Sequence, residues 1–275
     1  MFFTTHYCDG VDVPIGAICG VYSVSESKKV FFSKGNLQYR ATSNTWRFAE
    51  KQYEVIGINN QNISSNYYGL IDLFGWGTSG RLNSFPYNTS STSQYGGGLG
   101  HENDDIAGTN YDWGVYNRIW NGGDQEGLWR TLTNEEWNYL LEKRNTSSEI
   151  RYVHAQVNGV NGVVLLPDNW NAAVSVLNNS NPSGGGYGYM SNVVDAIVWQ
   201  DVFEPAGAVF LPAAGYRDVF SVLYLGQVCE YWSSTHYSNQ KAYYEDFRGY
   251  HQNWWDNETG YRHIGRSVRL VCPVE

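Results

Sequence analysis

Short runs of apolar residues, separated by turn-forming residues, recur along this chain and predict many short strands. Val30–Phe32 and Leu37–Tyr39 flank the turn-forming group Ser33–Asn36, so we expect these two runs to pair with each other. Trp46–Phe48 and Tyr53–Ile56 alternate polar with apolar residues, as half-buried strands do.

Two segments carry helix signals. Thr133 is followed three residues later by Glu136, a capping box in which each side chain bonds to the other residue's main-chain amide. The apolar residues that follow repeat at helical spacing and predict one buried stripe: Trp137, Leu140 and Leu141. We expect this helix to end near Arg144, and a second helix over residues 195–204.

A hairpin is predicted between these helices. Residues 152–157 and 160–166 are apolar-rich and are joined by Asn158-Gly159, a strong signal of a two-residue hairpin turn. Asn161-Gly162 follows three residues later and is an alternative position for the turn.

The two ends of the sequence differ in character. Residues 1–18 are polar and turn-rich, which predicts an appendage before a single domain of residues 19–275, with regular structure starting near Val21. Near the other end, Val268–Val271 is expected to form a central strand beside Val209–Leu211, with Val268 or Leu270 buried.

The middle of the chain, residues 57–127, is rich in Asn, Ser and Gly and carries aromatic residues at intervals. Disordered segments lack such rings, so we expect loops that pack on themselves. Within this region, His101–Asp105 gathers three carboxylates within four residues. Calcium prefers such oxygen ligands, but the alternation and the fixed Gly of a calcium loop are missing. A solvated acidic turn is the alternative interpretation.

Residues 215–271 combine aromatic residues with Asn, Ser, Gly, Asp and His, at spacings that fit neither helix nor strand. Rigid rings beside small hydrogen-bonding residues are typical of binding surfaces, whereas an aromatic-rich loop packed on its own domain is the alternative. This pattern predicts an exposed ligand site: Tyr243, Tyr250, Trp254, Trp255 and Tyr261, with His236, Asn239, Arg248 and His251.

Composition and charge narrow the function classes. The net charge of −9 and the lack of a basic face argue against nucleic acid as a partner. No apolar run approaches the roughly 20 residues of a membrane span, so direct membrane insertion is not expected, and no signal peptide is visible. Of the four cysteines, Cys8 and Cys19 can pair across a short loop, whereas Cys229 and Cys272 are expected to be buried thiols.

No catalytic signature is present. GxSxG, Walker, HExxH and GxGxxG patterns are all missing, and no cysteine spacing suggests zinc. His236, His251 and His263 lie near acidic residues, but nothing in the sequence fixes them in an acid–base geometry. We therefore expect no enzymatic activity, no cofactor and no metal.

An ordered series of short motifs resembles one protein family. The pieces run from Val24 to Val271 and include Gly35–Tyr39, Thr45–Ala49, Leu73–Gly80, Asp112–Gly114, Trp129–Thr133, Leu165–Asp168, Leu211–Arg217, Tyr231–Ser234 and Gly265–Val271. Together they resemble the variable proteins of diversity-generating retroelements and their non-diversified relatives in gut bacteria and phages. The resemblance covers about residues 20–275.

The resemblance implies an α+β fold of the C-type lectin type, in its formylglycine-generating-enzyme-like form. In that fold a small twisted antiparallel sheet, two helices and long irregular loops present a ligand surface from the C-terminal region, here about residues 215–271. The pair of active cysteines in the enzymatic branch is not matched by Cys229 and Cys272.

The variable positions implied by the resemblance, together with the aromatic pattern, give the expected ligand-binding residues. They are Asp218, Phe220, Tyr224, His236, Tyr237, Asn239, Tyr243, Glu245, Arg248, Tyr250, His251, Asn253, Trp254, Trp255, Asp256, Tyr261 and His263.

The expected function is receptor recognition or adhesion, with a protein or glycan on another cell as the partner. The implied location is extracellular, on a cell surface or a phage particle such as its tail, and the chain can form a homo-oligomer. Two alternatives remain at this point: a calcium-dependent carbohydrate-binding lectin that uses His101–Asp105, and a formylglycine-generating type of oxidase.

Overall fold

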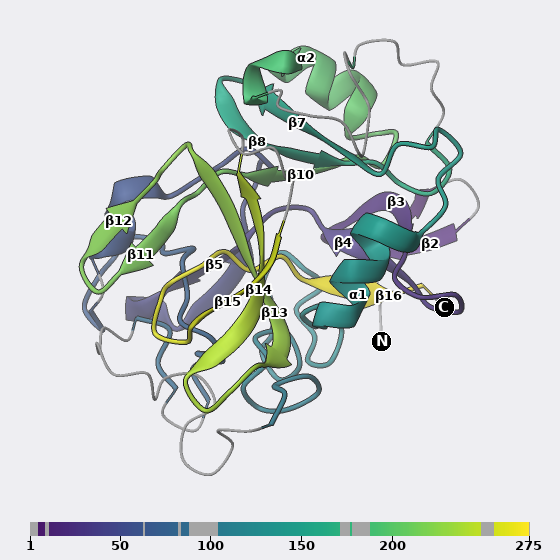
Figure 1. The fold of residues 1–275 in the computed structure, drawn as a ribbon. Helices are drawn as coiled ribbons and strands as arrows, with labels where there is room; N and C mark the ends of the chain where they lie inside the picture. Colours follow the sequence, from purple (N-terminus) through teal and green to yellow (C-terminus); the bar gives the residue numbers. More distant parts are fainter. Residues whose placement is uncertain are drawn as a thin grey trace.

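The computed structural model describes residues 5–8, 11–62, 64–81, 84–87, 104–170, 177, 188–248 and 256–274. Over these ranges the chain is a mixed α+β structure, made mostly of small sheets with two short helices (Figure 1). The buried apolar side chains of the described residues form three clusters.

One three-stranded sheet joins the N-terminal and C-terminal parts of the chain. Its order is β16-β4-β3, all antiparallel, with β3 at Ala17–Ser23, β4 at Lys29–Ser33 and β16 at Val271–Pro273. A separate two-stranded sheet precedes it, formed by β1 (Thr5–Cys8) and β2 (Val11–Pro14). Val13, Ala17 and Ile18 are buried in the core, so the core begins earlier in the sequence than the expected boundary after residue 18.

The strands near residue 35 are placed correctly by the sequence, but their pairing is not. β4 pairs with β3 and β16, whereas β5 (Leu37–Arg40) pairs with β6 (Thr45–Phe48) across the 3-10 turn η1 (Ala41–Ser43). Tyr53–Ile56 forms no strand and leads into a second 3-10 segment, η2 (Gly57–Gln61).

A four-stranded sheet lies beneath the second helix. Its order is β10-β8-β7-β9, with β7 at Tyr152–Val157, β8 at Val160–Leu165, β9 at Val193–Val194 and β10 at Val209–Pro212. The predicted hairpin is confirmed, because β7 and β8 pair on either side of Asn158-Gly159. Both turn residues have positive φ angles, 48° and 80°, which Asn and Gly tolerate best.

Both predicted helices are confirmed. α1 (Asn134–Asn138) continues as a π-helical segment, η3 (Tyr139–Lys143), and its capping box is complete: the Glu136 amide donates to Thr133 Oγ1 at 3.1 Å, and the Thr133 amide donates to Glu136 Oε2 at 3.0 Å. α2 (Ala196–Val198) also continues as a π-helical segment, η5 (Trp199–Phe203). A short 3-10 turn, η4 (Tyr189–Ser191), precedes α2 in the chain. Among the helices of the described residues, none is long and apolar enough to cross a membrane.

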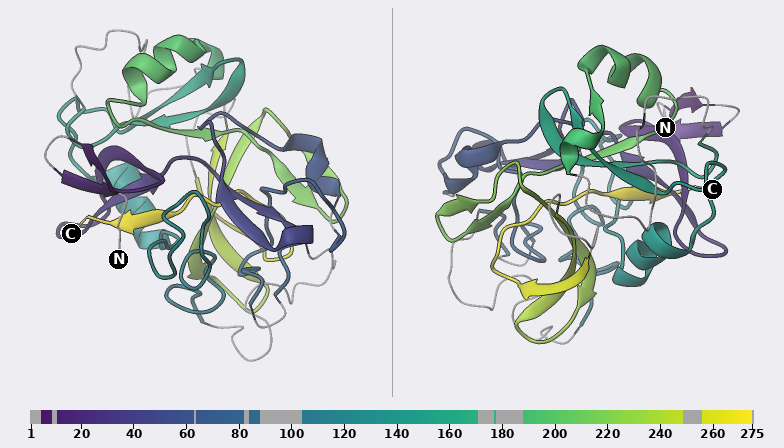
Figure 2. Two further views of the ribbon diagram at one scale, coloured as in Figure 1. Left: turned by 180° about the vertical axis from the view of Figure 1, so that it is seen from behind. Right: turned by 45° about the horizontal axis from the view of Figure 1, so that its top comes forward.

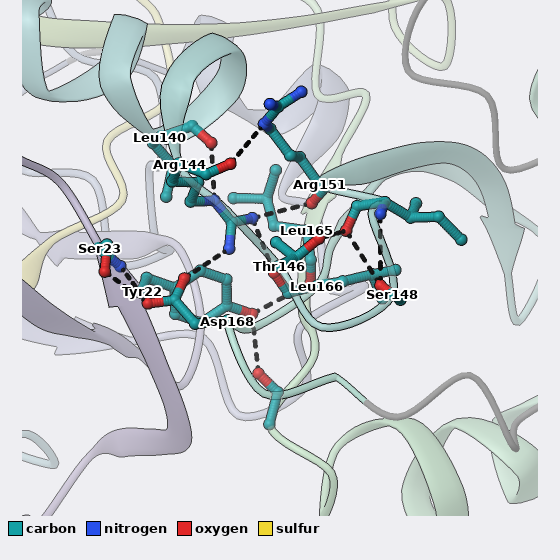
Figure 3. A network of polar contacts seen from close by, with 12 residues as sticks. Tyr22, Ser23, Leu140, Arg144, Thr146, Ser148, Arg151, Leu165, Leu166 and Asp168 are labelled. Carbon is teal, nitrogen blue, oxygen red and sulfur yellow. Dashed lines mark hydrogen bonds and ion pairs between the residues drawn. The ribbon is translucent and has the colours of Figure 1, made fainter.

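A buried arginine ties the first helix to two of the sheets (Figure 3). Arg144, just after η3, is completely buried and donates to Asp168 Oδ1 at 2.9 Å and to the Leu166 carbonyl at 2.7 Å. The second oxygen of Asp168 accepts from the amide and hydroxyl of Ser23 at the end of β3. The guanidinium also lies 5.1 Å from the ring centroid of Tyr22, so one ion pair connects η3, β3 and the end of β8.

The segment between η2 and α1 has no named helix or strand among its described residues. The segment is folded, as predicted, but it does not pack only on itself. Its buried rings belong to the same core cluster as Leu37 of β5 and Trp46 of β6: Phe74, Trp76, Tyr111 and Trp113. Tyr68 and Trp120 are instead exposed.

The C-terminal region forms a further three-stranded sheet and a separate hairpin. The sheet has the order β13-β14-β15, with β13 at Val228–His236, β14 at Lys241–Arg248 and β15 at Asp256–Tyr261. The hairpin consists of β11 (Tyr216–Asp218) and β12 (Ser221–Leu223). Figure 2 shows from two further directions that this hairpin lies on the opposite side of the molecule from β3, β4 and β16.

The expected strand at Val268–Val271 is only partly correct. Val268 and Leu270 are completely buried, as predicted, but β16 begins at Val271 and pairs with β4, while β10 pairs with β8. The carbonyls of Val268 and Leu270 accept from the amides of Leu37 and Ser33, each at 2.9 Å. The segment is therefore central, although it is not the neighbour of β10 in a sheet.

We expect Leu270→Ala to lower the free energy of unfolding by about 2–5 kcal/mol, because it leaves a cavity in the core. Chemical denaturation measures this change. Ile197→Ala is the control, since Ile197 is 71% exposed and its truncation opens no cavity. A Leu270→Ala protein with wild-type stability would show that this segment is not part of the core.

Candidate functional site

The turn between β13 and β14 presents a cluster of exposed rings. Tyr237 is 55% exposed and Tyr261 is 47% exposed, and Tyr243 and His263 beside them are partly exposed. We call this cluster, together with the exposed Asn239, the turn surface. All five of its residues were predicted to bind ligand, and the structure brings them to one end of the β13–β15 sheet.

The rings of the turn surface form two pairs. Tyr237 and Tyr243 meet edge to face, with centroids 5.4 Å apart, and Tyr261 stacks on His263 at 5.6 Å. Lys241 Nζ lies 5.1 Å from the Tyr261 ring centroid, within the range of a cation–π contact. The surface therefore offers ring faces and edges, one ammonium group and the amide of Asn239, but no carboxylate of its own.

A buried arginine supports this turn from below. Arg262 is 1% exposed and stacks on Trp76, with its guanidinium carbon 4.4 Å from the ring centroid. It donates to the main-chain carbonyls of Ser238 and Lys241, and its own amide donates to the Gln240 carbonyl at 3.0 Å. Because these acceptors are main-chain atoms, Arg262 fixes the path of the turn whatever side chains the turn carries.

His236, at the end of β13, joins this region to the long middle segment. Its Nδ1 lies 2.7 Å from Asp105 Oδ1, and its amide donates to the same oxygen at 2.9 Å. The amide of Ile106 also donates to the Ser234 carbonyl at 2.9 Å. His236 was predicted to bind ligand, and the structure gives it a second task, which is to hold residues 104–106 against β13.

The β11–β12 hairpin carries a second exposed group of side chains. Asp218 and Ser221 are the last paired residues, so Val219 and Phe220 form a two-residue turn at the tip. The exposed apolar residues here and in the adjoining η2 are Phe220, Leu223, Tyr224, Leu225 and Ile58, which we call the hairpin surface. Phe220 and Tyr224 were predicted to bind ligand, whereas Leu225 and Ile58 were not.

His263 of the turn surface lies near Asp218 of the β11–β12 hairpin. Burial lowers its pKa from the usual range; the nearby Asp218 of the hairpin opposes this shift, while Arg266 and Arg217 reinforce it. The hairpin also bridges to this segment directly, because the amides of Arg217 and Gly265 each donate to the other residue's carbonyl at 2.8 Å. The base of the hairpin is therefore bonded to the segment that follows β15.

Arg266 fixes the sheet beneath the turn surface. Its Nε donates to Glu230 Oε2 at 2.6 Å, and both side chains are almost completely buried. The guanidinium carbon lies 4.5 Å from the ring centroid of Trp232 and 3.8 Å from that of Tyr244. Gly260 is required opposite, since a Cβ there would come within 2.5 Å of the Arg266 side chain.

Glu245 was predicted to contact ligand, but it is completely buried. It lies opposite Asn257 of β15, whose amide donates to Asn134 and Asn138, so α1 covers this part of the sheet. The two carboxylate oxygens of Glu245 have no hydrogen-bond partner among the described residues. Burial, reinforced by the neighbouring Asp246, raises the pKa of Glu245 well above its usual range.

Two further predicted residues, Arg248 and Asp256, lie at the other end of the β14–β15 hairpin. Asp256 pairs with Asp246, five residues along the strand from the Lys241–Tyr261 pair, which separates the two ends by about 17 Å. Arg248 ends β14, and the structure describes only the main chain of Arg248 and Asp256. The last five predicted residues lie outside the described residues: Tyr250, His251, Asn253, Trp254 and Trp255.

The geometry bears on the two alternative functions, a calcium-dependent lectin and a formylglycine-generating type of oxidase. Among the described residues, no group of three or more His, Cys, Asp or Glu side chains could hold a metal ion. Of the acidic stretch 101–105, only Asp104 and Asp105 are described, and Asp105 is bonded to His236. Cys229 and Cys272 are buried free thiols whose pKa values are raised by burial, which disfavours the reactive thiolate.

Cys19 is disulfide-bonded. This agrees with the pairing considered for the N-terminal cysteines, although the side chain of Cys8 lies outside the described part of the chain.

Comparison with known proteins found no matching family model, no matching curated protein and no matching solved structure.

Glu245→Gln should change how stability depends on pH. A raised pKa in the folded state means that wild-type stability is greatest with the carboxyl protonated and falls as pH rises through that pKa. Glutamine stays neutral, so the stability of the variant relative to the wild type should increase as pH rises from about 4 to 8. Near pH 4 this increase should be absent. Urea unfolding at several pH values measures the difference.

Glu258→Gln, at an exposed position of the same sheet, controls for the loss of one negative charge. A Glu245→Gln protein that loses stability relative to wild type as pH rises would contradict a raised pKa for the buried Glu245 carboxyl.

Proposed function

We propose that this chain is a ligand-binding protein that recognises a protein or glycan on another cell through its C-terminal loops, on a fold of the C-type lectin type. The observation that carries the proposal is the turn surface. Tyr237 and Tyr261 are each about half exposed, and polar groups lie among the rings. Rigid amphipathic rings next to small polar residues provide affinity at a low cost in conformational entropy.

The scaffold under the turn surface supports this role. Arg262 and Arg266 hold the turn and the sheet in place through buried contacts, so little order has to be gained when a ligand binds. A surface of this kind is preorganised, which is a property of binding sites that must recognise a partner with useful affinity.

The disulfide of Cys19 supports an extracellular location within the proposal. Disulfides form and persist in oxidising compartments and are rare where glutathione keeps thiols reduced. Display on a cell surface or a phage particle meets that condition, and it also places the turn surface where a receptor on another cell can reach it.

The proposal is tested by binding a labelled, multimerised form of the protein to a panel of bacterial cells. Tyr237→Ala and Tyr261→Ala should each weaken binding by about 2 kcal/mol if these rings are anchors, which is about thirtyfold. Their melting temperatures should stay close to wild type, because both rings are exposed. Flow cytometry and thermal unfolding measure the two quantities.

Trp120→Ala is the matched control, since its ring is 63% exposed beside β6 and belongs to neither surface. Cell binding by Tyr237→Ala and Tyr261→Ala that is as strong as that of Trp120→Ala and the wild type would refute the proposal. Binding that disappears with excess chelator would instead favour the calcium-dependent lectin, and a reverse transcriptase with a near-copy of codons 215–271 in the neighbouring DNA would support the family.

A further inference from the structure

A pocket of about 510 Å³ lies between the loop that joins β3 to β4 and the helical segment formed by α1 and η3. Val24, Ser25 and Lys28 line it from the loop, and the rest of the lining comes from residues 133–143. We propose that this pocket binds a small sugar that carries an anionic group. The inference goes beyond the proposed function and does not depend on it, because the lining residues belong to neither the turn surface nor the hairpin surface.

The ion pair of Arg144 and Asp168 holds the two walls of the pocket together (Figure 3). Arg144, which follows Lys143 of the helical wall, donates to Asp168 Oδ1 at 2.9 Å. Asp168 Oδ2 accepts from the amide and the hydroxyl of Ser23, just before the loop, at 2.9 and 2.6 Å. A pocket whose walls are already fixed loses little conformational entropy when a ligand binds.

The loop wall is also ordered by hydrogen bonds of its own. The amides of Val24 and Ser25 donate to the Lys28 carbonyl at 2.9 and 3.3 Å. Ser25 Oγ accepts from the amides of Ser27 and Lys28 at 3.2 and 2.9 Å. The main chain of Lys28 is therefore fixed, and its side chain starts from a defined point beside the pocket.

The hydrogen-bonding capacity that remains in the pocket consists mostly of donors. Ser25 Oγ already accepts two amides, and Thr133 Oγ1 accepts the Glu136 amide, which leaves both hydroxyl hydrogens to donate. Asn138 Oδ1 accepts from Asn257 at 3.2 Å, which leaves the NH₂ group of Asn138. A ligand that is rich in acceptors fits such a lining.

Two lysine side chains add positive charge from opposite walls. Lys28 belongs to the loop and Lys143 ends η3, and each ammonium group carries three donors. Within the described part of the chain neither forms an ion pair, whereas Lys34 is paired with Glu50 at 2.8 Å. In a chain of net charge −9, two such ammonium groups on one pocket give a local attraction for an anion.

The acidic side chains of the lining do not cancel this attraction. Arg130 donates to both oxygens of Glu136, at 2.6 and 2.8 Å, and the Thr133 amide donates to one of them. Glu135 is exposed and has no such partner among the described residues. Its carboxylate can accept a hydroxyl hydrogen of the ligand, while the two ammonium groups bind the anionic group.

The remainder of the ligand is expected to be a sugar. Val24 is the only aliphatic residue among the described residues of the lining, so little of the wall suits an apolar side chain or a base. Tyr139 is partly buried and offers a ring and a hydroxyl. Sugar hydroxyls can accept from the donors and donate to Glu135 at the same time, which a lining of several donors and one acceptor requires.

Isothermal titration calorimetry with glucose 6-phosphate, glucose 6-sulfate, glucuronate and glucose tests the inference. We expect an anionic sugar to bind and glucose to bind much more weakly, and the ranking of the three anionic sugars identifies the preferred group. Lys28→Gln and Lys143→Gln should each weaken binding by about tenfold, since each removes charge-assisted hydrogen bonds. Tyr139→Phe removes only a hydroxyl and should weaken binding by about fivefold.

Lys29→Gln is the matched control. Lys29 is exposed, as Lys28 is, but it does not line the pocket, so the variant loses the same charge and should bind as the wild type does. In NMR spectra, the amide shifts caused by the sugar should concentrate at Ser25, Lys28 and Tyr139. Thermal unfolding of each variant verifies that the fold is intact.

The inference would be overturned if no anionic sugar binds better than glucose, or if Lys28→Gln and Lys143→Gln bind as the wild type does. Equal losses in Lys29→Gln and Lys28→Gln would also overturn it, because a general attraction to the charged surface would then suffice. Inorganic phosphate that binds as tightly as glucose 6-phosphate would show a site for a bare anion instead of a sugar. Amide shifts confined to other parts of the chain would place the sugar elsewhere and refute the assignment of this pocket.

Discussion

A buried arginine needs hydrogen-bond acceptors around its guanidinium group. In the C-terminal half of this protein, these contacts hold the loops that supply the acceptors in place. A guanidinium carries five donors and keeps its charge at neutral pH; even Arg217, whose pKa is lowered to about 10 by burial, stays a cation there. Arg217 takes main-chain carbonyls as its acceptors, Arg262 takes carbonyls of the β13–β14 turn, and Arg266 takes Glu230. Removing such a partner leaves an uncompensated buried charge, so each contact fixes the loop that supplies it.

The parts of the fold that the sequence predicts are those whose signals are local. The capping box of Thr133 and Glu136 and the turn at Asn158-Gly159 are complete within a few residues, and the structure has both. Strand pairing is different, because the group Ser33–Asn36 resembles a hairpin turn and yet β4 pairs with β3 and with β16, which comes more than 200 residues later. That choice depends on which distant strand buries Phe32, and no local pattern encodes it.

The residues of the candidate site also divide into those that the sequence predicts and those that it does not. Aromatic residues mixed with polar ones identified Tyr237 and Tyr261 correctly as exposed, because a segment of that composition cannot bury all of its rings. Glu245 reads as a surface residue in the sequence and becomes buried only because α1 packs across β14. The positive φ of Val219 was equally invisible, since it is imposed by a side chain and by packing at the base of the hairpin, and Val normally argues against such a turn.

The turn and the hairpin tip are held through main-chain atoms, and not through the exposed side chains. The atoms that Arg262 and Arg217 bind at the turn and the tip are carbonyls of Ser238, Lys241 and Val219, and every residue type supplies a carbonyl. Substituting an exposed side chain such as Tyr237 or Phe220 therefore leaves these hydrogen bonds in place and opens no cavity. The exposed side chains of loops held this way can therefore be exchanged at little cost in stability, whereas replacing the arginines beneath them would leave buried carbonyl acceptors without a donor.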